Sequence, residues 1–111
     1  MIEKTLYDYL KKELSVPVYM EVPPKPAKSF VTIQKIDGGR TNKINAATIS
    51  IESYAGSKFD ACSLSELVKE TMEEMGETST DVYSCKLGGE SDSSDLENKR
   101  YRYETIWNLY Y

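Results

Sequence analysis

The last thirteen residues alternate strictly between two faces, which predicts a closing β-strand over Lys99–Tyr111. One face is largely aromatic and consists of Tyr101, Tyr103, Thr105, Trp107, Leu109 and Tyr111. The other face carries Arg100, Arg102, Glu104, Ile106, Asn108 and Tyr110. A strand at a chain end frays unless it pairs with earlier segments. Because apolar residues occur on both faces, we expect cover on both sides, and in so short a chain a second subunit is a natural source of it.

Two segments repeat apolar residues at three- and four-residue steps, which predicts amphipathic helices over Ile2–Leu14 and Lys58–Met75. The first apolar stripe consists of Ile2, Leu6, Tyr9, Leu10 and Leu14, and the second of Ala61, Leu64, Val68, Thr71, Met72 and Met75. Ser57 is the expected N-cap of the second helix, and Gly76 its expected C′ residue. Pro17 ends the first helical region, since the residue before a proline avoids the α conformation.

Four shorter segments alternate like strands: Val18–Val22, Ser29–Asp37, Ala46–Tyr54 and Asp81–Leu87. Three prolines follow the first of them and predict an extended connection. Gly38–Lys43 is predicted as a polar connection that closes a hairpin. Gly88-Gly89 leads into a flexible, acidic and serine-rich loop over Glu90–Glu97.

The expected fold is α+β, with an antiparallel or mixed sheet of four to five strands and two helices packed on one face, in the order α-β-β-β-α-β-β. None of the connections between successive strands requires a helical crossover, which favours antiparallel neighbours. The length of 111 residues fits a single domain, 1–111. The other sheet face lacks a cover of its own, and Phe30 and Tyr54 are expected there. An open aromatic face invites association.

Composition narrows the classes of function. The chain carries a net charge of −4 with its cations spread out, which argues against a nucleic-acid surface. No apolar run approaches the ~20 residues that cross a bilayer, so no membrane partner is expected. The start of the chain lacks the order of a signal peptide. We therefore expect a cytoplasmic protein.

The chain contains no histidine, which removes the commonest general base, the usual nucleophilic triads and most zinc sites. Cys62 and Cys85 are expected to be free, buried thiols. The sequence does not exclude a disulfide between them. The glycine pairs lack the lysine and hydroxyl residue of a phosphate loop. We therefore expect no enzyme and no cofactor.

Two further patterns are considered as a cation site and a nucleic-acid surface, respectively. Asp92, Asp95 and Glu97 offer oxygens to a cation, but they lack the ligand order of an EF-hand, so no metal site is expected. Arg100 and Arg102 alternate with tyrosines, as in single-strand nucleic-acid binders. Because the whole chain is acidic, cross-strand packing is the better interpretation of this row.

Several segments share a layout with a known group of proteins. They are Leu10, Pro17–Pro23, Phe30–Ile33, Asp37–Gly39, Ala47–Ala55, Ala61, Arg100–Tyr103 and the aromatic end of the chain. In this layout the chain resembles the tail-terminator, or tail-completion, proteins of long-tailed bacteriophages and related prophages. The resemblance covers nearly the whole chain and includes no catalytic signature.

The resemblance implies an α/β sandwich-like subunit that forms a ring, commonly a hexamer, in the virion tail or neck after assembly in the host cytoplasm. Its implied partners are copies of itself, the tail tube protein and the head–tail connector. Two alternatives stay open: a phage head-completion or neck protein, and a small ligand- or RNA-binding α+β regulatory domain. The candidate subunit-interface residues are Arg40, Asp92, Asp95, Arg100, Arg102 and Trp107, with Arg100 and Arg102 expected to pair with acidic groups of a neighbour.

Overall fold

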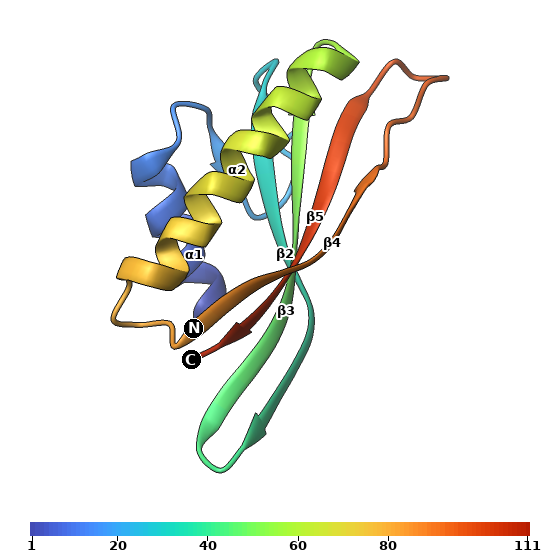
Figure 1. The fold of residues 1–111 in the computed structure, drawn as a ribbon. Coiled ribbons are helices and arrows are strands. Elements are labelled where there is room, and N and C mark those ends of the chain that lie inside the picture. The colour runs from blue at the N-terminus through green and yellow to red at the C-terminus, as the bar shows by residue number, and fades with distance from the viewer.

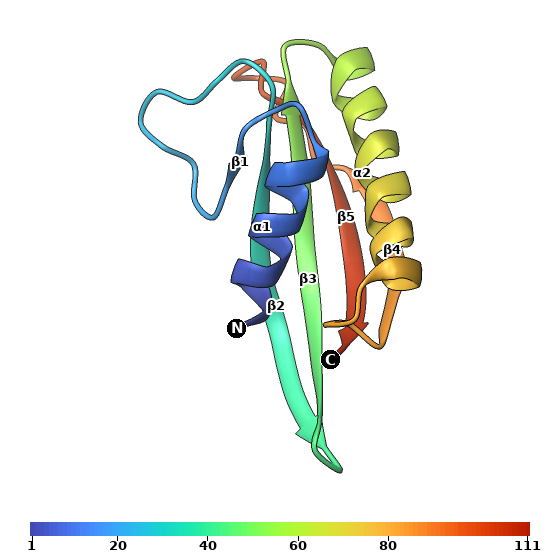
Figure 2. The same ribbon diagram turned by 90° about the vertical axis from the view of Figure 1, so that its left-hand side faces the viewer.

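Two helices lie on the same face of a twisted five-stranded sheet, and the opposite face carries no helix (Figures 1 and 2). The computed structural model describes residues 1–111. Its elements are α1 (Ile2–Glu13), β1 (Val18–Tyr19), β2 (Phe30–Thr41), β3 (Ile44–Ala55), α2 (Lys58–Thr78), β4 (Ser84–Asp92) and β5 (Tyr101–Tyr110). The strand order is β1-β2-β3-β5-β4, in a mixed sheet. The predicted fold class and element order are confirmed.

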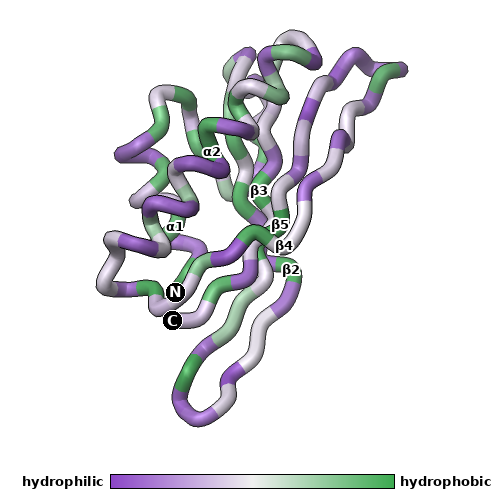
Figure 3. The backbone as a smooth tube through the Cα atoms, in the orientation of Figure 1, coloured by the Kyte–Doolittle hydropathy of each residue, from purple (hydrophilic) through white to green (hydrophobic).

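The core lies between the helices and the sheet, where the two predicted periodicities meet. Every second residue of β3 and β5 faces the helices, and Ile49, Ile51 and Leu109 are almost fully buried there. The helix stripes supply the opposing side chains, among them Leu6 and Val68, and 17 buried residues form one cluster. In Figure 3, hydrophobic stretches recur along β3 and β5 beside the helix layer.

The first strand differs from its prediction in length and direction. Only Val18 and Tyr19 pair, and they run parallel to β2, opposite Val31 and Thr32. The prediction of an antiparallel neighbour is therefore wrong for this pair. The physical reason is the proline-containing Met20–Ser29 segment, which is long enough to carry the chain back to the same end of the sheet (Figure 2).

The predicted polar connection at Gly38–Lys43 is largely strand. β2 and β3 stay paired through Gly38, Gly39 and Arg40, and only Asn42 and Lys43 form the turn. Both turn residues have positive φ, 51° and 65°, as a two-residue type I′ hairpin requires. Every residue from Gln34 to Ile44 is exposed. We call this segment the arm; it projects beyond the helix layer (Figures 1 and 2).

The second glycine pair also lies within a strand. β4 continues through Gly88 and Gly89 to Asp92, with a β-bulge between Leu87 and Gly89. The predicted flexible loop over Glu90–Glu97 is therefore partly strand. Helix α2 likewise continues past Met75 to Thr78, so Gly76 is not its C′ residue.

The start of α2 and the packing of Gly76 have clear local causes. The Ser57 hydroxyl accepts a hydrogen bond from the Asp60 N–H at 3.1 Å, so the predicted N-cap is confirmed. A Cβ on Gly76 would stand 3.2 Å from the Cβ of Cys85 and 3.3 Å from its carbonyl oxygen. Glycine at this position therefore lets α2 pack closely against β4.

The positive φ angles of the Asn42-Lys43 turn lead to a prediction about stability. Replacing Lys43 with glycine should raise the free energy of unfolding by about 1 kcal/mol, because a residue with a Cβ is strained at positive φ. Urea denaturation followed by circular dichroism measures the change. Lys43→Ala is the control for the loss of the charged side chain, and it should not stabilise. A Lys43→Gly protein no more stable than Lys43→Ala would contradict the assigned turn geometry.

Candidate functional site: the uncovered sheet face and the arm

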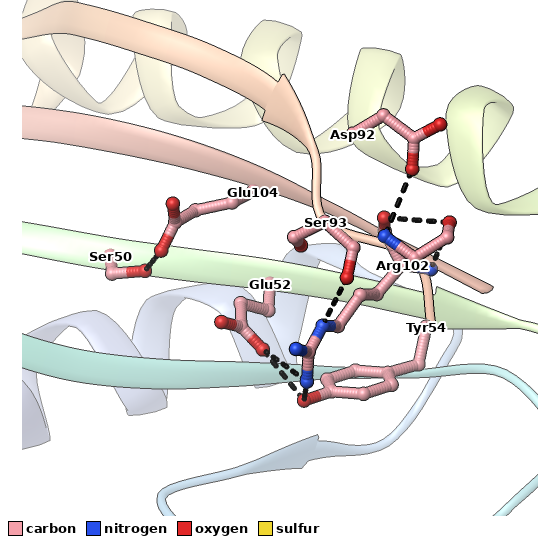
Figure 4. Close-up of polar contacts among 8 residues, drawn as sticks. Ser50, Glu52, Tyr54, Asp92, Ser93, Arg102 and Glu104 are labelled. Atoms are coloured by element: carbon pink, nitrogen blue, oxygen red, sulfur yellow. Dashed lines mark hydrogen bonds and ion pairs between the residues drawn. The ribbon is translucent and has the colours of Figure 1, made fainter. Parts of the chain in front are cut away.

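A polar cluster occupies the middle of the uncovered sheet face. Because side chains alternate along a strand, Ser50, Glu52 and Tyr54 of β3 share this face with Arg102 and Glu104 of β5 (Figure 4). The same alternation sends the intervening residues into the core. The local cause of the cluster is thus the polar half of two amphipathic strands.

Arg102 ties three parts of this face together. Its Nε donates a hydrogen bond to the Ser93 carbonyl oxygen at 2.7 Å, which fastens the connection between β4 and β5. Its Nη1 lies 3.4 Å from the Tyr54 hydroxyl and 3.8 Å from a Glu52 carboxylate oxygen. The Tyr54 hydroxyl in turn donates to Glu52 at 2.6 Å (Figure 4).

Two carboxylates stand directly opposite each other in this cluster. Glu52 and Glu104 are cross-strand partners in the β3–β5 ladder. Like charges at such positions repel, which destabilises the pair of strands. Neutral and cationic donors offset the repulsion, since Ser50 donates to Glu104 at 2.6 Å and Arg102 lies beside Glu52. The face is therefore held by polar contacts within the chain.

An aromatic stack closes one end of the same face. The rings of Phe30 and Tyr54 stack with centroids 4.4 Å apart, and the Tyr19 ring lies 5.3 Å from Phe30. The guanidinium groups of Arg100 and Arg102 lie 5.8 Å and 5.9 Å from the centre of the Tyr54 ring. Phe30 and Tyr54 were expected on the uncovered face and do lie there, but the stack buries both. Burial, followed by the hydrogen bond to Glu52, raises the pKa of the Tyr54 phenol.

A shallow groove runs beside the polar cluster. It has a volume of about 340 Å³, and the Met20–Val22 segment forms one wall. Thr32, Gln34 and Glu52 contribute to its floor. The lining mixes carboxylate, amide, hydroxyl and apolar groups, and the Tyr54 hydroxyl in it is hydrogen-bonded to Glu52.

The arm presents apolar side chains to solvent. Ile36 and Ile44 are 51% and 44% exposed, and Tyr110 at the base of the arm is 51% exposed. Ile44, Ala46 and Tyr110 line one hollow on the uncovered face. In Figure 3 the projecting hairpin alternates between hydrophilic and hydrophobic segments. The arm thus combines a regular backbone with an unburied apolar surface.

The predicted interface residues separate into distinct places. Arg40 lies in the arm, whereas Asp92, Asp95, Arg100 and Arg102 lie at the opposite end, around the β4–β5 connection. The carboxylate of Asp92 accepts from the Ser94 N–H at 3.0 Å and lies 3.1 Å from the Lys58 ammonium group. These contacts lower the pKa of Asp92 to about 2.

The β4–β5 connection is an ordered turn. The backbones of Asp95 and Arg100 exchange hydrogen bonds at 2.8 Å, and the Asp95 carboxylate accepts from the Asn98 side chain at 2.7 Å. These contacts and the Arg102 bond to Ser93 lie within the chain. For Arg102, the expected pairing with a neighbour's carboxylates therefore competes with contacts that already exist in one subunit. The Arg100 residue is exposed, and its guanidinium lies over the Tyr54 ring.

Trp107 is not available to a neighbour. Its side chain is 0% exposed, at the centre of the core cluster, and its indole N–H donates to the Thr105 hydroxyl at 2.8 Å. The prediction of Trp107 as an interface residue is therefore wrong. The reason is register: the odd-numbered residues of β5 face the helices, so the aromatic face of the strand fills the subunit's own core.

Sequence reasoning missed the residues that shape the uncovered face and the arm. Glu52 and Tyr54 were assigned to a strand, but nothing in the sequence places them beside Arg102, which is 48 positions from Tyr54 along the chain. Ile44 lies between the predicted connection Gly38–Lys43 and the predicted strand Ala46–Tyr54, so the sequence assigned it to neither. The available signal was the Asn-Lys pair between two alternating segments, which fits a two-residue hairpin.

Several other features of the chain are settled by the structure. Cys62 and Cys85 are free, and burial raises the pKa of the Cys85 thiol to about 11. No group of three or more Cys, Asp or Glu side chains is placed to hold a metal ion. Neither helix is long and apolar enough to cross a membrane. No protein-family model matches the chain, and no curated protein sequence matches it.

Arg102 should contribute measurably to stability. Arg102→Leu should lower the free energy of unfolding by about 1–3 kcal/mol, because the Ser93 carbonyl loses its donor and Glu52 faces Glu104 without a cation. Adding Glu52→Gln should recover part of the loss, since it removes one of the two opposed charges. Urea denaturation of the single and double variants gives both values. No recovery in the double variant would contradict the electrostatic part of this account.

Trp107 should behave as a core residue. Trp107→Ala should cost about 3–5 kcal/mol of unfolding free energy, because it removes the largest fully buried side chain. Tyr110→Ala, on the same strand but on the uncovered face, is the matched control and should cost far less. Circular dichroism is the readout, since the only tryptophan is lost. Equal costs for the two variants would contradict the assigned register.

Proposed function

We propose that this protein is a structural subunit of a bacteriophage tail, a tail-terminator or tail-completion protein. It acts by binding copies of itself into a ring on the end of the tail tube, where the ring meets the head connector. The arm is the observation that carries this proposal. The resemblance described in the sequence analysis supplies the phage setting.

The arm favours a docking role for a physical reason. A two-stranded ribbon has little stability of its own in water. Here the ribbon continues from the core strands, and it exposes Ile36 and Ile44. Association would bury these side chains, at roughly 25 cal/mol for each Å² of apolar surface removed from water. Extended, regular structure with unburied apolar residues is typical of a contact surface.

The subunit has different surfaces at its two ends, which favours assembly into a ring. A cyclic assembly joins one patch to a different patch on the next copy, so each subunit needs two. The arm lies at one end of the sheet and the ordered β4–β5 turn at the other (Figure 1). The uncovered face between them is held by its own polar contacts, so it remains stable before the partner arrives.

Substitutions in the arm test the proposal. Ile36→Ser with Ile44→Ser should leave the free energy of unfolding within about 1 kcal/mol, because both side chains are exposed. The same variant should fail to complement deletion of the gene in the phage. Deletion itself should give tails of uncontrolled length, seen by electron microscopy, and purified wild-type protein should bind one end of isolated tail tubes.

The control is Leu67→Ser with Phe59→Ser, which removes two exposed apolar side chains from α2. This variant should complement the deletion. Tails of normal length that join heads in the deletion strain would contradict the proposal. Tails of normal length that fail to join heads would instead indicate a neck or head-completion protein. Full complementation by the arm variant would show that the arm is not the docking surface.

A further inference from the structure

Both edges of the sheet carry backbone groups without a partner. β1 pairs with Val31 and Thr32 only, so the outer side of β2 is unpaired over Ile36–Thr41 in the arm. At the opposite edge β4 pairs with β5 alone, and its outer side is unpaired over Leu87–Asp92. Such edges are templates for adding another strand. The two free segments have similar lengths.

The hydrogen bonds around the arm show which groups of β2 point outward. Asn45 exchanges both backbone hydrogen bonds with Tyr111, at 2.9 Å and 2.8 Å, and so turns away from β2. Its partner Arg40 therefore directs its N–H and C=O to the outer side. By the same alternation Gly38 points outward, and its N–H is held by the Asp37 carboxylate at 2.9 Å. Arg40 thus offers the free donor at this edge.

The same reasoning identifies the outward groups of β4. The Ser93 N–H donates to the Arg102 carbonyl oxygen at 3.1 Å, so Ser93 points toward β5. Alternate residues then point away, which places the N–H and C=O of Asp92 and Glu90 on the outer side. The bulge at Gly88 lies at the far end of this segment.

Strand direction and charge favour joining unlike edges. β2 and β4 run in opposite directions, because three antiparallel pairings separate them. A copy rotated about an axis can therefore place its β4 antiparallel to β2, and the contact repeats around a ring. The arm carries Lys35, Arg40 and Lys43 against one carboxylate, whereas α2, which packs beside β4, carries two lysines against six carboxylates. Two like edges would bring two cationic arms together.

We propose that subunits join head to tail by sheet extension, with the arm edge of β2 in one copy pairing antiparallel with the β4 edge of the next. The inference deepens the proposed function, on whose self-association it rests. Main-chain hydrogen bonds supply the pairing, and the cationic arm beside the acidic α2–β4 side sets its polarity. Each edge is thus occupied by another copy of the same chain, one neighbour at the arm edge and one at the β4 edge.

Proline substitution tests each edge separately. Arg40→Pro and Glu90→Pro each remove an outward donor, and edge strands tolerate proline there. Light scattering of wild-type protein should show mass rising with concentration beyond a dimer. Each proline variant alone should stay monomeric, while Arg40→Ala and Glu90→Ala, which keep the donors, should still associate. A mixture of the two proline variants should form dimers and nothing larger, because each retains one competent edge.

Three results would overturn the inference: wild-type protein that is monomeric at its highest soluble concentration, a single proline variant that forms the wild-type assembly, or a mixture that stays monomeric. If the proline substitutions unfold the subunit, amide hydrogen exchange of the wild-type protein tests the edge pairing instead. Protection of Arg40 and Glu90 that grows with concentration supports the pairing, and unchanged exchange overturns it. The deletion phenotype is independent of these outcomes, so failure of edge pairing and failure of the tail function are distinguishable.

Discussion

The packing of both helices on one face of the sheet is the constraint on which the rest of the molecule depends. β3 and β5 lie at the centre of this arrangement, and their alternate residues meet the stripes of α1 and α2 in a single buried cluster. Trp107 fills the middle of that cluster with no exposed surface. A chain of this size makes one such core, and the opposite face must be made compatible with water by other means.

The uncovered face meets this requirement with polar contacts among its own side chains. Glu52 and Glu104 repel each other across two strands, and Ser50, Tyr54 and Arg102 offset that repulsion with hydrogen bonds and charge. At one end of the face, stacking buries the apolar ring surfaces of Phe30 and Tyr54. Exposed apolar side chains remain in the arm, at Ile36 and Ile44, and also on the outer side of α2, at Phe59 and Leu67. In the proposed assembly, the contacts between copies use the arm and the opposite edge of the sheet.

A subunit with unlike ends is suited to repeating contacts. The arm is long, cationic and partly apolar, and the other edge lies beside an acidic helix. Contacts between unlike surfaces continue from copy to copy until they close, whereas contacts between like surfaces stop at two. The assembly proposed above requires no catalytic group, because it depends only on contacts between subunits.

The sequence by itself determined the elements, because periodicity is a local property that each segment carries. The two helices, the faces of β3 and β5, the Ser57 cap and the α+β order all followed from it. Tertiary structure alone decided which β5 face entered the core, and so turned Trp107 from a surface candidate into a core residue. It also decided that glycine pairs at 38–39 and 88–89 continue strands, because neighbouring strands supply the hydrogen bonds that local propensity does not encode. The meeting of Arg102 with Tyr54 and Glu52, and the parallel direction of β1, depend on contacts between residues distant in the chain, which no local pattern specifies.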